Sequence, residues 1–219
     1  MHSLKLIAGL GNPGRKHERD RHNVGFWFAS RLAVAQRIEL KSVAKYHGLL
    51  GRLGRPSGDL WLLLPQTYMN LSGKSVGALA RFYRIQPQEI LVVHDELDFP
   101  PGVAKLKLGG GVAGHNGLKD ISQRLATHDY WRLRLGVGKP PAGMEGADYV
   151  LQKPPAEERA AIDAAIERSL AVLPQCLSGD IQSAMQKLHT DEDKKAEPKK
   201  EPEKESGLKS SLKALFGRK

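Results

Sequence analysis

The sequence lacks features that define several large classes of protein. It has a single cysteine, Cys176, so no disulfide can form within the chain, and we expect an inert core thiol there. No stretch approaches the ~18 to 20 apolar residues of a membrane span, and the opening run MHSLKLIAGLGN has no cleavage-site pattern. These absences argue against a disulfide-stabilised secreted protein and an integral membrane protein. They predict a cytoplasmic location without stable membrane association.

Acidic residues are scarce relative to basic ones. The 219 residues include 34 Lys and Arg against 24 Asp and Glu, which gives a formal net charge of +10 and an isoelectric point near 9.7. Such an excess favours a polyanionic partner such as nucleic acid. Charge alone does not distinguish RNA from DNA or from a membrane surface. The length suffices for one sizeable core and an appended segment.

The hydrophobic pattern predicts alternating strands and helices. Short continuous apolar runs, typical of strands covered on both faces, lie at 4–8, 60–65 and 90–94. Apolar residues recur at helical spacing in 26–37, 76–83 and 156–173. The segment 131–138 alternates like a strand with one basic face. This alternation predicts one α/β domain built around a sheet.

The composition changes near residue 190. Residues 190–206 contain no apolar residue larger than alanine, so burial cannot offset the entropy lost on ordering them. We therefore expect a catalytic domain over 1–189 and a disordered Lys/Glu/Pro-rich linker within 190–219. The linker leads to a short basic amphipathic segment, which is either a frayed tail in solvent or a transient helix that touches RNA or membrane.

The GLGNPG motif at residues 9–14 has the glycine spacing of a dinucleotide-binding fingerprint. A nicotinamide-dependent enzyme is therefore one alternative. That fingerprint requires a helix to start at its third glycine, so that backbone amides face a pyrophosphate. Here the next residues are RKHERDRHN, a polar run with no face to pack on a sheet. The pattern therefore disfavours a dinucleotide cofactor, and we expect none.

Two further patterns argue against a nucleotide or metal site. GKS at 73–75 resembles the end of a phosphate-binding loop, but Tyr68 stands where that loop needs glycine. His17 and His22 would lie roughly 140° apart around a helix, whereas zinc-binding histidines share one face. We therefore predict neither nucleotide hydrolysis nor a bound metal.

Amide, imidazole and carboxylate side chains are concentrated in loops after the expected strands and in glycine-rich turns. Because strand-end loops hold the ligands of α/β sheets, these residues are the candidates for a functional site. They are Asn12, His22, Asn23, Asn70, His94, Asp95, Glu96, Asp98, His115 and Asn116.

The candidates fall within motifs that resemble those of a known family. Over roughly residues 4–188 the sequence is similar to the bacterial-type peptidyl-tRNA hydrolases, through the blocks GLGNPG, RHNVGF, TYMNLSG, HDELDFPPG, KLGGGVAGHNGLKD and RLRLGVGKP. The resemblance implies a single α/β domain with a twisted mixed β-sheet flanked by helices. It also implies a monomeric hydrolase without metal or cofactor. Such an enzyme cuts the ester between the peptide and the 3′-terminal ribose of peptidyl-tRNA, which recycles tRNA from stalled translation products.

The resemblance assigns the reaction to three residues. The histidine of RHN, here His22, is the family's catalytic base, and the first aspartate of HDELD, here Asp95, is its partner. A neutral imidazole can take a proton from water, and a carboxylate can stabilise the imidazolium that forms. Asn116 is assigned to the water and the tetrahedral centre. Asp20 stands where the family commonly has threonine, and its charge is expected to raise the pKa of His22.

The resemblance also implies how the peptide is held. Asn12 and Asn70 would bind the backbone of the nascent peptide, and Tyr68 and Met69 would form part of the channel around it. His115 is placed with these substrate-binding residues and is expected to support the site through a hydrogen bond. Taken singly, Asn12 could be a turn residue and Asn70 a helix N-cap.

Basic residues around the GGG loop and the 131–138 strand predict contact with RNA. Lysine and arginine can neutralise phosphates and so position a tRNA without reading its sequence. By resemblance, Lys107 and Arg134 clamp the tRNA 5′-phosphate, although Arg132 is close enough to serve in place of Arg134. A non-catalytic RNA-binding relative is the second alternative. The presence of His22 and Asp95, with all three site asparagines, disfavours it.

Overall fold

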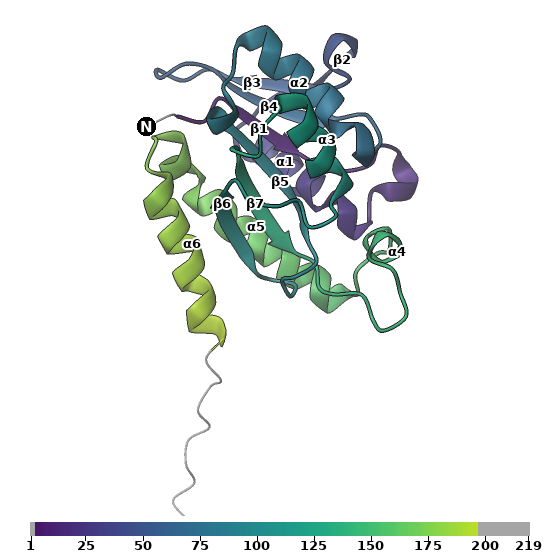
Figure 1. Cartoon of the computed structure of the whole chain (residues 1–219). Helices are drawn as coiled ribbons and strands as arrows, with labels where there is room; N and C mark the ends of the chain where they lie inside the picture. Colours follow the sequence, from purple (N-terminus) through teal and green to yellow (C-terminus); the bar gives the residue numbers. More distant parts are fainter. Residues whose placement is uncertain (1–2, 197–219) are drawn as a thin grey trace, which may run out of the picture.

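The computed structural model describes residues 3–196, with side chains as far as residue 189. Within these residues the chain forms a seven-stranded sheet of order β2-β3-β4-β1-β5-β7-β6 (Figure 1). The strands are β1 (Leu6–Gly9), β2 (Lys41–Val43), β3 (Gly48–Leu53), β4 (Leu60–Pro65), β5 (Ile90–Glu96), β6 (Ala104–Leu108) and β7 (Trp131–Gly136). Strands β4, β1, β5 and β7 form a parallel centre. Strand β6 pairs antiparallel at one side, and β3 and then β2 do so at the other.

Helices cover both faces of the sheet. On one face, α2 (Ser72–Tyr83) and α3 (Asn116–Leu125) pack against each other and share a buried apolar cluster with the sheet. On the other face, a second cluster joins the sheet to α1 (Val24–Ala35), α5 (Ala156–Leu177) and α6 (Ile181–Ala196). The short α4 (Gly146–Val150) lies near one end of the sheet. The predicted α/β class, with a mixed sheet between helices, is confirmed.

The central strands are apolar because both of their faces are covered. Every residue of β5 is buried. Alternate side chains enter opposite layers, so that Val92 belongs to the cluster under α2 and α3 and Val93 to the cluster under α1 and α5. This explains why continuous apolar runs, instead of alternating patterns, mark the centre of the sheet.

The outer strands β6 and β7 have two different faces. Leu106 and Leu133 pair across the strands and belong to the cluster that includes α5 and α6. The intervening positions carry the basic residues and pair as Lys105 with Arg134 and Lys107 with Arg132. Since strand side chains alternate between faces, all four cations lie on the face opposite to α5 and α6. The predicted basic face is therefore present on β7 and continues onto β6.

The GLGNPG segment brings a helix close to β1. A Cβ atom at Gly9 would lie 2.3 Å from the carbonyl oxygen of Gly25 in α1, and one at Gly25 would lie 2.4 Å from the carbonyl oxygen of Val93. No helix starts at Gly14; two short 3₁₀ turns follow, and α1 begins only at Val24. The glycines thus permit helix–sheet packing, and the geometry of a dinucleotide fingerprint is absent from this described segment.

Some elements differ from the predicted ones. Strands β2, β3 and β6 and helices α3, α4 and α6 were not predicted: β2, β6 and α4 are short, β3 contains two glycines, and α3 and α6 are largely polar. Helix α6 continues to Ala196, so the expected domain boundary after residue 189 falls inside a helix. Residues 197–219, with the rest of the expected linker and the basic segment, lie outside the described residues. Cys176 is buried, as expected. Among the described helices, none is long and apolar enough to cross a membrane.

Candidate active site

A cleft of about 600 Å³ opens where the parallel strands end. Segments after β1 and β4, the end of β5, the start of α3 and the basic face of β6 and β7 line it. The ten residues to which the family resemblance assigns a role all line this one cleft: Asn12, His22, Tyr68, Met69, Asn70, Asp95, Lys107, His115, Asn116 and Arg134. Of the other candidates, His94 and Glu96 line it as well, whereas Asn23 and Asp98 do not. The fold therefore gathers at one edge of the sheet residues that come from six separate motifs.

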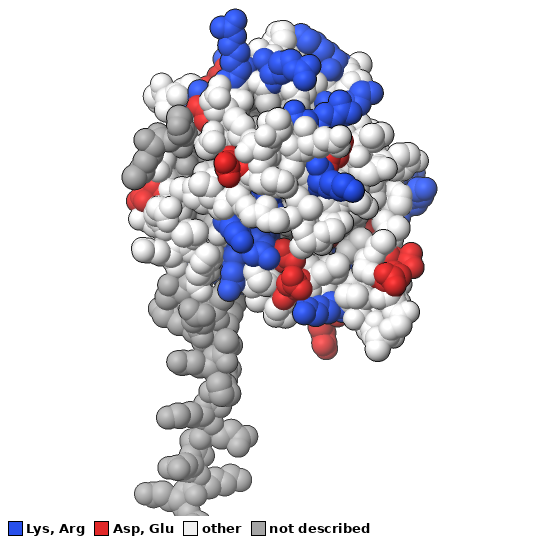
Figure 2. All heavy atoms as spheres, viewed as in Figure 1, with Lys and Arg blue, Asp and Glu red and all other residues white. Residues whose placement is uncertain are grey.

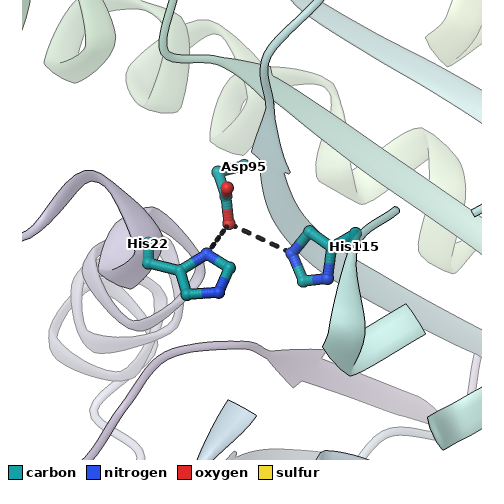
Figure 3. A group of neighbouring side chains, drawn as sticks. All are labelled: His22, Asp95 and His115. Carbon is teal, nitrogen blue, oxygen red and sulfur yellow. Dashed lines mark hydrogen bonds and ion pairs between the residues drawn. The ribbon is translucent and has the colours of Figure 1, made fainter. Parts of the chain in front are cut away.

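Asp95 lies between two histidine rings (Figure 3). Its Oδ1 atom is 2.8 Å from Nδ1 of His22 and 3.1 Å from Nε2 of His115. Asp95 belongs to β5, His22 to the 3₁₀ turn η2 (Arg21–Asn23), and His115 is the N-cap of α3. The structure thus brings His22 and Asp95 into direct contact although 73 positions separate them.

The hydrogen bonds indicate which ring nitrogens carry protons. Nδ1 of His115 accepts from the backbone amides of Gly117 and Leu118, so the neutral ring carries its proton on Nε2 and donates it to Asp95. Nδ1 of His22 faces the same carboxylate, which can only accept, and therefore donates as well. Nε2 of His22 is then an acceptor, which is the state needed to take a proton from water.

The pKa values of the pair move in opposite directions. Burial lowers the pKa of His22, but the charge of Asp95, its hydrogen bond and the charge of Asp20 together raise it above its ordinary value. Burial raises the pKa of Asp95, but His22 and His115, through charge and hydrogen bonds, hold it well below its ordinary range. Asp95 is therefore a carboxylate near neutral pH. The expected upward influence of Asp20 on His22 is confirmed in direction.

The same three side chains are close enough to hold a metal ion, because their ligand atoms lie within 4.8 Å of one another. Coordination through Nε2 of His115 would move the ring proton to Nδ1. That proton would point at the amide donors of Gly117 and Leu118, and α3 would lose the acceptor that caps it. The donor arrangement therefore fits a hydrogen-bonded acid–base group better than a metal centre.

Two buried residues flank His22 and hold its turn in place. Arg21 donates to the backbone oxygen of Gln152 and to Glu158, at 3.1 and 2.8 Å, and its guanidinium lies 4.1 Å from the ring centre of Tyr149. Asn23 accepts from the backbone amide of Asn12 and donates to its carbonyl oxygen, both at 2.9 Å. Neither Arg21 nor Asn23 was assigned a specific role from the sequence. Their position beside His22 in the RHN motif was the available signal.

Asn12 links two of the loops that line the cleft. Its backbone is held by Asn23, and its side-chain oxygen accepts from the backbone amide of Met69 at 2.8 Å. Met69 itself is buried, whereas Tyr68 and Asn70 are exposed at the cleft. Asn70 lies in the 3₁₀ turn η4 (Met69–Leu71), and Leu71 is the N-cap of α2, so the alternative role of Asn70 as that cap is not observed.

The two arginines of β7 differ in what they contact. Arg132 is buried and donates through both terminal nitrogens, each at 2.6 Å, to the carbonyl oxygens of Gly110 and Gly111. Arg134 is partly exposed, and its Nε donates to Glu96 at 2.8 Å. Its guanidinium lies 4.3 Å from the ring centre of Phe99, and its terminal nitrogens form no hydrogen bond with the described residues. Arg132 thus fixes the GGG loop, and Arg134 and the exposed Lys107 offer charge to the cleft. Figure 2 shows basic side chains grouped over this part of the sheet.

His94 is a buried histidine behind the pair. Its Nδ1 donates to the backbone oxygen of Asp95 at 2.7 Å, and its ring meets His115 edge-on at 5.0 Å. Burial, assisted by the charge of His115, lowers the pKa of His94 to about 3. His94 is therefore neutral near pH 7, and it fixes the backbone that carries Asp95.

The fold and the cleft define the class of protein, an α/β enzyme with a histidine held by a buried aspartate at the carboxyl edge of its sheet. The family described as peptidyl-tRNA hydrolase matches residues 6–198. The peptidyl-tRNA hydrolase of Nitrosospira multiformis is 55% identical over 189 residues, 86% of this chain and 99% of that one. The enzyme of Thiobacillus denitrificans is 56% identical over 195 residues, 89% and 93% of the two chains.

A solved structure agrees with these relatives. The crystal structure of peptidyl-tRNA hydrolase from Acinetobacter baumannii has a TM-score of 0.82 at 44% identity, and the match covers 86% of this chain and 96% of that chain. The chain belongs to the peptidyl-tRNA hydrolase family.

Proposed function

We propose that this protein hydrolyses the ester between peptide and tRNA in peptidyl-tRNA, with His22 as the base that activates water. The observation that carries the mechanism is the 2.8 Å contact between Nδ1 of His22 and Oδ1 of Asp95 inside the cleft. The enzyme acts as a cytoplasmic monomer. Membership of the family and the cleft's combination of imidazole, amide and cationic groups support this function.

The first step is proton transfer from water to His22. Nε2 accepts a proton as the water oxygen attacks the ester carbonyl carbon, and the positive ring is stabilised by Asp95 through Nδ1. The resulting tetrahedral centre collapses by breaking the bond to the ribose oxygen. His22 returns the proton to that oxygen, so the products are a free carboxylic acid and a free tRNA hydroxyl. A positioned base of this kind contributes roughly 10² to 10⁴ in rate.

The amide side chains at the cleft complete the chemistry. Asn116 is the first residue of α3 and is exposed at the cleft next to His115, so its amide can bind the water and the oxygen that becomes negative. Asn12 uses its side-chain oxygen to hold Met69, which leaves its amide nitrogen to donate to a peptide carbonyl. Asn70 and Tyr68 offer further contacts along the exposed rim of the same loop.

The basic face of β6 and β7 positions the RNA. Lys107 and Arg134 lie diagonally on neighbouring strands, and such positions are roughly 7 to 8 Å apart between Cα atoms. One phosphate can therefore bind between the two side chains. Because Arg132 is occupied by backbone carbonyl oxygens, Arg134 is the better partner for Lys107. These contacts set the position of the tRNA without reading its bases.

His115 supports Asp95 and the start of α3. Both of its ring nitrogens are engaged, one with Asp95 and the other with the amides of Gly117 and Leu118. Its expected contact with substrate is therefore limited to the ring surface that lines the cleft. We assign His115 to positioning, because a ring without a free nitrogen cannot exchange protons with the substrate.

The test is release of tRNA from N-acetylated aminoacyl-tRNA in the presence of EDTA, with the unacetylated ester as a specificity control. Wild-type protein should release tRNA, preferentially from the acetylated ester, and His22→Ala should lower kcat about 10² to 10⁴-fold. Dependence on metal would reveal itself as loss of wild-type activity in EDTA.

Each other outcome has a distinct meaning. No release by the wild type would favour the non-catalytic RNA-binding relative. Equal release by wild type and His22→Ala would leave the hydrolase standing and remove His22 as its base. A fluorescence titration with NAD should show no binding, and saturable binding would revive the nicotinamide alternative.

A further inference from the structure

A group of aromatic side chains lies on the surface away from the cleft, near the C-terminal end of α2. We call Trp61, Phe82 and Tyr83 the aromatic shelf. The ring of Trp61 stacks on that of Tyr83 at 4.2 Å and 28°, and Phe82 meets Tyr83 edge-on at 4.9 Å. Tyr46 is buried beside them, 5.8 and 6.1 Å from the last two rings. The shelf is therefore held in a fixed arrangement by ring packing.

The shelf is unusually exposed for apolar residues of this size. Phe82 is 54% exposed and Tyr83 is 37% exposed, and the two are adjacent in sequence. Of the other large apolar residues exposed on the described surface, Tyr68 and Leu151 line the cleft, whereas the aliphatic Val34, Leu71 and Leu108 do not. Adjacent exposed aromatic rings outside the cleft therefore indicate a second place where a partner binds.

Cations lie near the aromatic shelf, in space or in sequence. Nζ of Lys45 lies 3.4 Å from the ring centre of Phe82. Arg81 and Arg84 flank the shelf in sequence, are exposed, and form no ion pair with the described residues. Both line an open groove of about 420 Å³ between α2 and the end of α3, next to the shelf in sequence but lined by none of its rings. Figure 2 shows basic side chains grouped over the upper part of the molecule, where Figure 1 places α2 and β2.

We propose that the aromatic shelf is a second RNA-binding site, one that stacks unpaired bases while Arg81 and Arg84 bind the adjoining phosphates. Aromatic faces and cations together match the two chemical parts of a single-stranded nucleic acid. A base-paired helix already stacks its bases internally, so it can use the cations but not the rings. A purely acidic protein partner would likewise use the cations alone. The combination therefore selects an unpaired nucleic acid, and the proposed function makes RNA the partner.

The aromatic shelf is separate from the catalytic cleft. Helix α2 starts just after the cleft residue Asn70 and runs away from it for 12 residues, about 18 Å at the usual rise. No residue of the shelf lines the cleft. The shelf therefore adds affinity for an RNA and takes no part in cleaving the ester. Only the choice of RNA as partner rests on the proposed function.

The test is fluorescence anisotropy of the full chain with a labelled oligouridine and, in parallel, with a duplex RNA of equal length. The double variant Phe82→Leu with Tyr83→Leu keeps apolar side chains but removes the rings. It should weaken oligouridine binding about tenfold and leave duplex binding unchanged. Arg81→Gln with Arg84→Gln should weaken both and reduce the salt dependence by about 0.7 per lost phosphate contact. A charge-matched control removes exposed lysines elsewhere, Lys153→Gln with Lys187→Gln.

Two readouts separate this proposal from the hydrolase itself. Hydrolysis of a peptide esterified to a short terminal oligonucleotide should be equal in wild type and shelf variants, because that substrate reaches only the cleft. If the wild type fails to hydrolyse it, the proposed function fails and the binding result still stands. Unchanged oligouridine affinity in the Phe82→Leu and Tyr83→Leu variant would contradict the proposed role of the aromatic shelf. So would a lysine control that weakens binding as much as the Arg81→Gln and Arg84→Gln variant does.

Discussion

The two sides of the cleft differ in how many of their polar groups already have hydrogen-bond partners within the protein. On the acid–base side, His22, Asp95 and His115 are hydrogen-bonded to one another. On the side proposed to bind RNA, Lys107 is exposed, and Arg134 uses Nε to bind Glu96 and stacks its guanidinium on Phe99, while its terminal nitrogens form no hydrogen bond with the described residues. A group that must exchange protons benefits from a fixed geometry, whereas a phosphate contact benefits from groups that remain available. The comparison predicts that changes on the first side alter kcat and pH dependence, and changes on the second alter KM and salt dependence.

The largest effect that this comparison predicts comes from removing the charge of Asp95. Asp95→Asn retains the size of the side chain but cannot stabilise a positive His22, so kcat should fall by about 10²-fold or more. The measurement is single-turnover hydrolysis at saturating enzyme. A large change in KM with constant kcat would contradict the assignment of Asp95 to the acid–base side.

The free energy of unfolding should depend on pH through His94, which is buried behind the acid–base side. Its folded pKa of about 3 lies below its ordinary value, so between these values the unfolded chain binds a proton that the folded chain excludes. Stability that is present above pH 6.5 is therefore lost as pH falls toward 3, by up to about 1.4 kcal/mol per pH unit. Denaturant unfolding should show a flatter dependence for His94→Gln. The exposed His128→Gln serves as control, and an equal flattening there would remove His94 as the cause.

The side of the cleft proposed to bind RNA is tested by comparing two lysines of β6. Lys107→Gln should raise KM for full-length substrate about tenfold with little change in kcat, and the difference should shrink as salt rises. Lys105→Gln removes an equal charge from the same face of β6, but Lys105 does not line the cleft. Equal effects of the two substitutions would show that general charge, and no specific phosphate contact, accounts for binding.

A smaller effect is expected for Asp20, which lies near the acid–base side without touching the ring of His22. The charge of Asp20 contributes to the raised pKa of His22. Since His22 must be neutral to act, activity should rise with pH through that pKa. Asp20→Asn should move the acidic limb of the pH–rate profile to lower pH by less than about one unit. A shift to higher pH would contradict the sign of this interaction.

The sequence predicted the members of the site better than their contacts. The ten residues assigned by the family resemblance line one cleft, because the motifs that carry them also place them after strands of one sheet. The partners of Asn23, Arg132 and Glu96 could not be inferred, since each depends on a loop or strand brought alongside by the fold. The register of β6 and β7 pairs Arg132 with Lys107 and Arg134 with Lys105. This register could not be predicted from a short strand in which every second residue is charged.

The same limit applies to the elements of the fold. The buried strands β1, β4 and β5 were predicted from continuous apolar runs, since both of their faces are covered. Strand β6, with lysine at every second position, lies at the sheet edge, and α3 begins in a glycine-rich polar segment. Their hydrophobic signal is weak because each buries only one side.

The most direct test of the account is to titrate His22 itself. Long-range nitrogen–proton NMR on the intact protein reports the tautomer and the pKa of this ring, and the pH dependence of single-turnover hydrolysis reports the pKa of the essential base. The account predicts one pKa, above 6.5, in both measurements, with the neutral ring protonated on Nδ1. A neutral His22 protonated on Nε2, or a kinetic pKa that differs from that of His22, would contradict the role of His22 as the base held by Asp95.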